Sequence, residues 1–427
     1  MTFPGGLMRV RQMRARGGPK AGRRAITLVD QGLSSVSNIL AVVLVARVLS
    51  PDDFGRFSLG YAVLTLALLL SRMYLGTRIS LAADPATARR LTEELVAGLL
   101  IVSPVLIAVV FAVSALLSSG RSLPMLLIIA IATPVVCLQD LIRFGAAASG
   151  RPWAAVTSDG TWVLLMLVPF LLGLSLSAAA ALALWFAAAL AALAVAVGHY
   201  RLRPRPRAGW ARLRSREPVG ESLTLSALLV QVAVLWILAL ATRVISPAAA
   251  GALRGASTSM GPVNVLFAFS QLGLTSALVR RPRSADLQFS ARCGLAMAAV
   301  TAVWGTALLL LPDPLGTAAF GQSWAGIRAV LPWTVLEYLA LCAAAGAILG
   351  LKVRRRARDL LAQRAGAAAF TLLVGTAVAL VTGRAWCVAA ALAGSALISA
   401  GTGWLHLWRS PLPVATAAPL VSRAVQR

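Results

Sequence analysis

Ionisable and amide side chains interrupt several long apolar stretches of this sequence. In the first stretch, Asp30, Ser34, Ser37 and Asn38 follow an i, i+4, i+7, i+8 spacing, which places them on one face of a helix. An ionisable group within hydrocarbon is costly and normally faces the interior of a helix bundle or a water-filled cavity. We therefore expect this polar stripe to face inward.

Arginines form a second set of candidates. Arg72 lies well inside the second apolar stretch, whereas Arg47 and Arg243 lie near the ends of the first and seventh. A guanidinium binds phosphate or carboxylate through two hydrogen bonds, so an arginine-lined cavity would select an anionic cargo, such as a lipid linked through phosphate or pyrophosphate. Arg47 and Arg243 could instead extend to the membrane surface, as long cationic side chains do.

Polar residues of the second half complete the predicted cavity. The full set of candidate substrate-binding residues is Asp30, Ser34, Asn38, Arg47, Arg72, Gln231, Arg243, Asn264 and Glu337. Small polar residues such as Ser34 and Asn264 could equally be contacts between helices. Four separated cysteines without a CxxC pair and only two histidines predict neither a metal site nor a disulfide framework. No catalytic residue or cofactor is expected.

Composition explains which elements must position these residues. Of 427 residues, 59% are apolar and 13% are charged, and the mean hydropathy is +0.82. Soluble proteins are nearer half apolar and a quarter charged, so a soluble enzyme, a disordered chain and a disulfide scaffold are excluded. A membrane-spanning helix needs about 20 apolar residues. The composition therefore predicts an all-α integral membrane protein with about 12 transmembrane helices.

Apolar segments between charges, prolines and glycines mark the expected helices. They cover 26–48, 54–79, 91–117, 123–147, 153–174, 177–199, 221–245, 250–279, 287–311, 325–350, 359–381 and 384–408. This division predicts a basic tail (1–25), a six-helix bundle (26–199), a linker (200–220), a second six-helix bundle (221–408) and a second tail (409–427). Alternating arginine and proline in the linker predicts an extended chain.

Basic residues are distributed unevenly along this pattern. The chain has 40 Lys and Arg against 14 Asp and Glu, a net charge of +26, and 30 of the 40 fall in the two tails, the linker and the even-numbered loops. Because Lys and Arg mark cytoplasmic loops, both termini are predicted to be cytoplasmic, and nucleic acid is not an expected partner. The linker could also contact anionic headgroups or a cytoplasmic enzyme. The ten remaining basic residues are the functional candidates.

An internal repeat relates the two halves. Residues 47–51 read Arg-Val-Leu-Ser-Pro and are followed by Gly55, and residues 243–247 read Arg-Val-Ile-Ser-Pro and are followed by Gly251, at a constant offset of 196. Proline ends the first helix, serine can bond local backbone, and glycine allows close helix packing. Six crossings per half give both halves the same orientation, so we expect a parallel repeat that encloses a central cavity.

These residues carry a resemblance to a known group. The stretches 30–38 and 46–55 resemble the first two helices of polysaccharide exporters in the multidrug/oligosaccharidyl-lipid/polysaccharide (MOP) flippase superfamily, and 139–144, 150–152 and 159–162 are similar to their fourth and fifth helices. In the second half, the resemblance rests mainly on the six-plus-six pattern of apolar segments and on the repeated turn. The resemblance implies two six-helix bundles in a V shape, alternating access, and export of lipid-linked glycans.

The predicted function is a flippase for a lipid-linked oligosaccharide or polysaccharide in the bacterial cytoplasmic membrane, used in cell-surface polysaccharide biosynthesis. Its expected partners are the bilayer, the anionic glycan lipid and cytoplasmic or membrane glycosyltransferases, with an ion gradient or the membrane potential as energy source. One alternative is a cation-coupled exporter of small molecules or drugs, for which Asp30 or Glu337 could supply the buried acid. Another is a non-transporting scaffold. A major-facilitator loop motif, and the large loop or acid cluster of a glycan polymerase, are not found.

Overall fold

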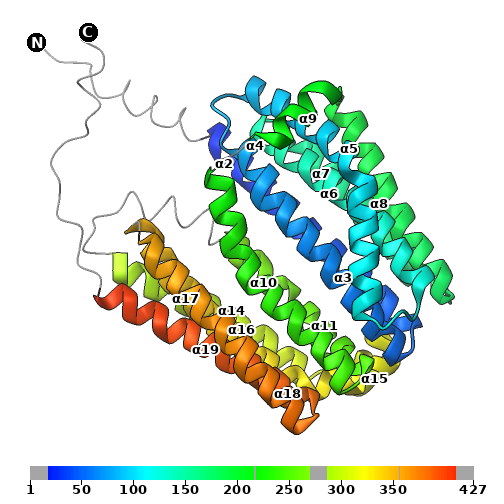
Figure 1. The fold of residues 1–427 in the computed structure, drawn as a ribbon, viewed down its shortest axis with the longest axis vertical. Helices are drawn as coiled ribbons and strands as arrows, with labels where there is room; N and C mark the ends of the chain where they lie inside the picture. The colour runs from blue at the N-terminus through cyan, green and yellow to red at the C-terminus, as the bar shows by residue number, and fades with distance from the viewer. Residues whose placement is uncertain (1–17, 216–217, 270–285, 355, 410–427) are drawn as a thin grey trace, which may run out of the picture.

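The computed structural model describes residues 18–215, 218–269, 286–354 and 356–409, and within them every regular element is helical. Eleven helices in this part of the chain are long and apolar enough to cross a membrane. The described chain is therefore that of a multi-pass α-helical membrane protein (Figure 1). The predicted helical fold class is confirmed.

Six membrane helices make up the first half. They are α2 (Gly18–Val48), α3 (Pro51–Ser71) with its continuation through the π-helical turn η1 (Arg72–Gly76) into α4 (Thr77–Ser80), α5 (Pro85–Leu117), α6 (Leu123–Ala148), α7 (Trp153–Leu171) and α8 (Ala178–Tyr200). Each predicted segment of this half corresponds to one of these helices. The helix starts follow local chemistry, because proline occupies the first turn of α3, α5 and α6, where its missing N–H costs nothing.

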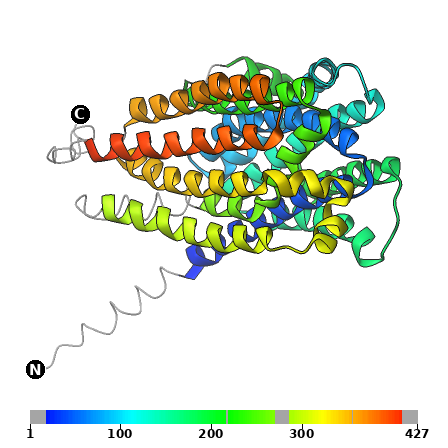
Figure 2. The ribbon, with the colours of Figure 1, turned by 90° about the horizontal axis from the view of Figure 1, so that it is seen from below.

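The second half contains α10 (Pro218–Val244), α11 (Pro247–Ser259), α12 (Gly261–Phe269), α14 (Asp286–Leu309), α15 (Asp313–Phe320), η4 (Gly321–Ser323), α16 (Trp324–Val353), α17 (Ala357–Phe370), η5 (Thr371–Gly375), α18 (Thr376–Thr382) and α19 (Ala385–Arg409). Several of these helices run side by side in Figure 2. The eighth predicted segment, 250–279, is divided at Met260 between α11 and α12, and its last ten residues lie outside the described part. The short helix α15 was not expected.

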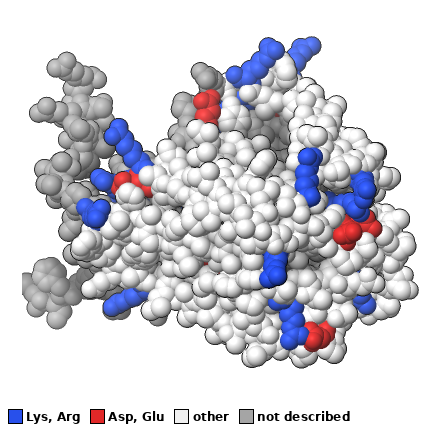
Figure 3. Space-filling model, turned by 60° about the horizontal axis from the view of Figure 1, so that its bottom comes forward, with Lys and Arg blue, Asp and Glu red and all other residues white. Residues whose placement is uncertain are grey.

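The surface of the molecule matches a lipid environment. Leu171, Val303 and Val381 are each more than two thirds exposed, and Figure 3 shows a face on which wide areas carry no charged side chain. Apolar surface of this extent is stable against lipid tails but not against water. The interior, in contrast, holds fully buried large side chains such as Phe57 and Trp185, whose rings meet edge to face.

Successive membrane helices run in alternating directions between two ends of the molecule. We call the end where α2 begins and α19 ends the linker end, because α9 (Pro206–Arg214) connects the halves there. The other end, where α3, α11 and α16 begin, is the turn end. The two halves meet along α3, which packs against α10 and α11, and along α2, which packs against α12 and α15 (Figure 1).

The repeated turns contact each other at the turn end. Ser50 and Ser246 accept hydrogen bonds from the backbone N–H three residues later, each at 3.2 Å, so both turns are capped as the sequence predicts. The Asp52 carboxylate accepts a hydrogen bond from the Ala248 N–H at 3.2 Å. Ala248 is the counterpart of Asp52 at the repeat offset, so the acid of the first turn binds the backbone of the second.

Glycine makes the crossing of α3 and α11 possible. A Cβ atom on Gly55 would lie 1.7 Å from the Pro247 carbonyl oxygen, and one on Gly251 would lie 3.1 Å from the Gly55 nitrogen. No larger residue fits without separating the two turns. The two copies of the repeated turn therefore pack directly against each other and join the two halves.

The linker differs from its prediction. Residues 206–214 form the helix α9 rather than an extended chain, because Pro206 favours the first helical turn and the helix packs closely on α5, with Gly209 against Gly98. Two buried acids of α5 hold it, since Arg205 lies 3.2 Å from Glu93 and Arg212 lies 3.0 Å from Glu94. The expected extended linker is wrong for these residues.

Candidate functional site

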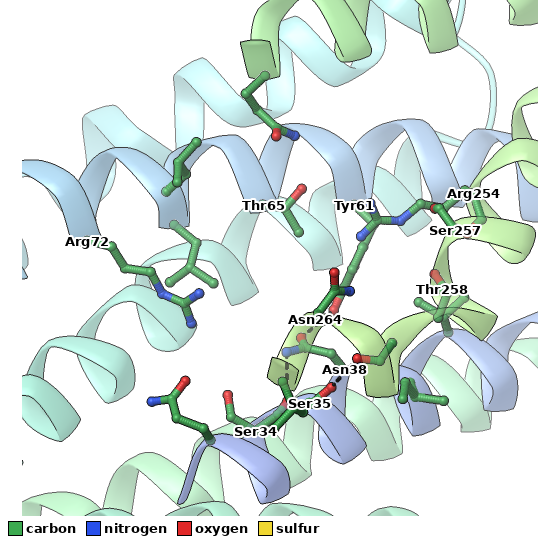
Figure 4. A pocket seen from close by; sticks show the side chains of 18 of the residues that line it. Ser34, Ser35, Asn38, Tyr61, Thr65, Arg72, Arg254, Ser257, Thr258 and Asn264 are labelled. Atoms are coloured by element: carbon green, nitrogen blue, oxygen red, sulfur yellow. Dashed lines mark hydrogen bonds between the residues drawn. The ribbon is translucent and has the colours of Figure 1, made fainter. Parts of the chain in front are cut away.

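A polar cavity of about 400 Å³, which we call the central chamber, lies between the two halves (Figure 4). The first half contributes side chains from α2, α3 and η1, and the second half contributes α10, α11, α12 and α16. Its polar lining residues are Gln31, Ser34, Ser35, Asn38, Tyr61, Thr65, Arg72, Gln231, Arg254, Ser257, Thr258, Asn264 and Tyr338. No acidic residue is among the described residues that line it.

The polar stripe of α2 forms one wall of this chamber. The Asn38 amide donates to the Ser34 carbonyl at 2.8 Å and accepts a hydrogen bond from the Tyr61 hydroxyl at 2.9 Å. Ser35 donates to the Gly261 carbonyl at 3.0 Å, across the boundary between the halves. Amides and hydroxyls that can both donate and accept thus face the chamber, a lining suited to a polyhydroxylated group.

Two arginines line the chamber, and they differ in whether a carboxylate compensates their charge. Arg72 forms a bidentate pair with Asp140, with both N–O distances at 2.8 Å, so its charge is compensated. Arg254 lies over the Tyr61 ring, 5.2 Å from its centroid. Within the described residues its guanidinium has no ion pair, and its buried Nε has no hydrogen-bond partner. Among the described residues, Arg254 is therefore a chamber cation without a counter-ion, and we expect it to attract an anion.

A buried ionic network supports the chamber from the first half. Arg143 of α6 lies 2.9 Å from Asp30, 3.0 Å from Asp140 and 3.1 Å from Asp159. It also donates to the Ser34 hydroxyl at 2.9 Å, which connects the network to the chamber wall. Asp140 and Arg143 lie three residues apart on α6, and Arg143 is buried within that helix.

A second cavity of about 430 Å³ lies mainly within the second half, among α10, α12, α16, α17 and α19, and Leu69 of α3 also lines it. We call it the C-half pocket. Its walls are mainly alanine, valine, leucine and isoleucine, and its charged lining residues are Glu337 and Arg364. It adjoins the central chamber, because Leu69, Gln231, Asn264 and Tyr338 line both.

The structure distributes the sequence-predicted residues over several places. Ser34, Asn38, Arg72, Gln231 and Asn264 line the central chamber, whereas Glu337 lines only the C-half pocket.

Three predicted residues line neither cavity. Asp30 points to Arg143, the nearest buried cation, instead of the chamber. Arg47 lies 5.8 Å from the Phe170 ring centroid, and Arg243 donates to the Leu116 carbonyl at 2.7 Å, because both belong to the repeated turn at the turn end. The three side chains make these contacts instead of lining the cavity in which they were expected.

The list of candidate substrate-binding residues left out Arg254, Tyr61 and Tyr338, which line the chamber. The sequence position of Arg254 could have identified it as a site residue, because it is one of the ten basic residues outside the predicted cytoplasmic segments. No comparable feature of the sequence marks the two tyrosines, because a tyrosine in an apolar helix is as often a core residue as a site residue.

Comparisons with known proteins agree with this architecture. No protein-family model matches the chain, and no curated protein matches it in sequence. Among solved structures, the chain is similar to the lipid II flippase MurJ in its inward closed conformation, with a TM-score of 0.63, 9% identity, and coverage of 91% of this chain and 88% of that one. It is also similar to an inward-facing multidrug resistance MATE family transporter of the MOP superfamily, with a TM-score of 0.55, 14% identity, and coverage of 90% and 94%. The chain therefore has the fold of the MOP-superfamily transporters.

Proposed function

We propose that this protein is a flippase that moves a lipid-linked oligosaccharide or polysaccharide across the bacterial cytoplasmic membrane, with both termini in the cytoplasm. The single observation that carries the proposal is the uncompensated guanidinium of Arg254 in a chamber between the two halves. A charge in a low-dielectric site is favourable only with a partner, and a phosphate or pyrophosphate is the partner that guanidinium binds best.

The remaining chamber surface supports a glycan beside that anion. Serine, threonine, asparagine and glutamine side chains offer both donors and acceptors to sugar hydroxyls. The lipid tail would stay in the bilayer while the head group occupies the chamber. Glycosyltransferases that make the glycan would be the functional partners, on the cytoplasmic side or in the membrane.

The buried network is the candidate for energy coupling in this proposal. Three carboxylates, Asp30, Asp140 and Asp159, face two guanidiniums, Arg72 and Arg143. This group carries one more negative than positive charge, so one proton or small cation would neutralise it. Movement of that cation through the network would link an ion gradient to the chamber, because Ser34 belongs to both.

A cation-coupled exporter of small molecules is the second candidate function. The observation that favours it is Glu337, an acid in the largely apolar C-half pocket, in a chain whose fold is also that of a multidrug transporter. The two candidates differ in the charge of the cargo, so a binding measurement separates them.

The test compares two lipids that differ only in charge. Purified protein in lipid nanodiscs is titrated with a polyprenyl diphosphate-linked oligosaccharide and with a neutral glycolipid of the same chain and sugars. We expect tighter binding of the anionic lipid and about a tenfold or greater loss in Arg254→Gln, since hydrogen bonds to charged groups contribute about 1.5–3 kcal/mol. Arg121→Gln, an exposed arginine in the loop before α6, is the matched control.

A deletion strain provides the cellular test. We expect it to lose a surface glycan, with recovery by the wild-type chain and by Arg121→Gln but not by Arg254→Gln. Equal affinity for the charged and neutral lipids, or full activity of Arg254→Gln, would contradict the proposal.

A further inference from the structure

We propose that the exposed face of the linker helix α9 binds the anionic headgroups of membrane lipids. This face consists of Arg207, Trp210 and Arg214, and we call it the linker face. The sequence left open whether the linker contacts headgroups or a cytoplasmic enzyme, and the placement of α9 favours the headgroups. The proposal does not depend on the cargo of the central chamber, because none of the three residues lines either cavity.

The helix α9 has two distinct sides. Arg207, Trp210 and Arg214 follow an i, i+3, i+7 spacing, which places them on one side of the helix, and all three side chains are exposed. Gly209 and Leu213 lie four residues apart on the other side, which packs on α5. The packing on α5 therefore determines that the linker face points away from the protein.

The positive charge of the linker face is not compensated by the described part of the chain. Residues 201–214 contain six arginines and no acid. Arg205 and Arg212 pair with buried acids of α5, whereas Arg207 and Arg214 form no ion pair among the described residues. Clusters of about four to eight basic residues beside a membrane helix bind anionic lipids. Two guanidiniums thus remain available to lipid phosphates, which they bind through charge-assisted hydrogen bonds.

The contact between α9 and α5 lies near the expected boundary of the hydrocarbon. The two helices run side by side at the linker end (Figure 1). Nineteen residues separate Gly98, where they touch, from Leu117, the last residue of α5. At 1.5 Å per residue this is about 29 Å, close to the hydrocarbon thickness of about 30 Å. Leu100 and Ile101, next toward the turn end, are exposed as lipid-facing residues are, so α9 lies at the depth of the headgroups.

Trp210 favours a lipid over a soluble partner. Its side chain is 42% exposed, and the Arg214 guanidinium lies over its ring, 4.6 Å from the centroid. Tryptophan is enriched at the membrane–water interface because its ring is amphipathic. Arginine can lay its apolar stem against acyl chains while its guanidinium reaches the phosphates. The linker face thus combines an apolar ring with two cations, which matches the acyl chains and phosphate of an anionic lipid.

Fluorescence quenching measures which lipids lie beside α9. A bimane fluorophore is attached through Ala211→Cys, at an exposed position of α9, in the full-length chain without its native cysteines. The protein is placed in vesicles of equal parts phosphatidylcholine and phosphatidylglycerol, in which one of the two lipids carries brominated acyl chains. We expect brominated phosphatidylglycerol to quench about fivefold more than brominated phosphatidylcholine. This preference should decrease at high salt, which screens the attraction.

Two double variants test whether the preference belongs to the linker face. Arg207→Gln with Arg214→Gln removes both of its charges, and we expect the two lipids then to quench equally. Arg151→Gln with Arg358→Gln is the matched control, because it removes two exposed arginines from other loops at the same end. The control variant should keep the preference of the wild type. Thermal unfolding of each variant shows that it is folded.

Each contrary outcome has a distinct meaning. Equal quenching by the two lipids in the wild type would overturn the proposal. A preference that persists without Arg207 and Arg214, or that the control variant loses equally, would assign it to the net charge of the linker end and also overturn the proposal. Weak quenching by both lipids would place α9 in water, as expected for a surface that binds a cytoplasmic enzyme. Failure of the flippase proposal would leave the lipid preference at α9 unchanged.

Discussion

Arg143 faces three carboxylates from three different helices, namely Asp30 of α2, Asp140 of its own helix α6 and Asp159 of α7. Its side chain is 6% exposed, whereas that of Arg72, which meets only Asp140, is 34% exposed. Removing one partner of a buried ion pair leaves the other charge uncompensated. At the scale of single residues, Arg143 should therefore matter more for stability than any arginine on the surface.

We predict that Arg143→Gln lowers the free energy of unfolding by about 3–5 kcal/mol, the range found when one partner of a buried pair is removed. Arg72→Gln should lower it less, and Arg121→Gln should change it by less than about 0.5 kcal/mol. Reversible unfolding in mixed micelles measures the three values. Equal losses in Arg143→Gln and Arg121→Gln would show that the network does not stabilise the fold.

At the scale of elements, the crossing of α3 and α11 holds the halves together at the turn end. The contact depends on two glycines and on one hydrogen bond from the second turn to Asp52. Closely packed helices have discrete arrangements rather than continuous ones. A larger side chain in place of either glycine should therefore separate α3 from α11 at this end rather than deform their contact slightly.

Gly55→Leu is predicted to open the turn end, because its side chain would overlap the Pro247 carbonyl. In a background without the native cysteines, Thr258→Cys on the chamber wall should then react faster with a membrane-impermeant thiol reagent from the turn-end side. Gly198→Leu, at a glycine with no atom near its missing Cβ, is the matched control. Equal reaction rates in the two variants would mean that this crossing does not close the chamber.

At the scale of the whole molecule, the charge distribution predicts the orientation in the membrane. The linker end carries α9 and its neighbouring arginines, while the short loops of the turn end carry few basic residues, such as Arg121 and Arg384. Loops rich in Lys and Arg stay in the cytoplasm. The linker end should therefore face the cytoplasm, which would let a cargo made there enter the chamber from that side.

Labelling of single cysteines checks this orientation in intact cells. We predict that Asp313→Cys, at the turn end, reacts with an impermeant reagent from outside, and that Arg203→Cys, in the exposed linker, reacts only after permeabilisation. A permeant reagent that labels both positions controls for expression. Labelling of Arg203→Cys from outside would reverse the assigned orientation.

Much of the fold was determined by the sequence alone, because membrane insertion depends on hydrophobicity within windows of about 20 residues. The predicted segment 325–350 corresponds to α16, Trp324–Val353, and the repeated Ser-Pro turn marks the start of the second helix in each half. These features depend on neighbours in the chain, so local pattern was enough to find them.

The partners of the polar residues were decided only by the tertiary structure. Asp30 and Asn38 share one predicted helical face, yet Asp30 binds Arg143, 113 residues away, while Asn38 faces the chamber with Tyr61. Arg254 has no ion-pair partner among the described residues and Glu337 lines a different pocket, which their local sequence does not reveal. Helical periodicity states that a face is polar, but only the packing of distant helices decides which charges are compensated and which remain available to a ligand.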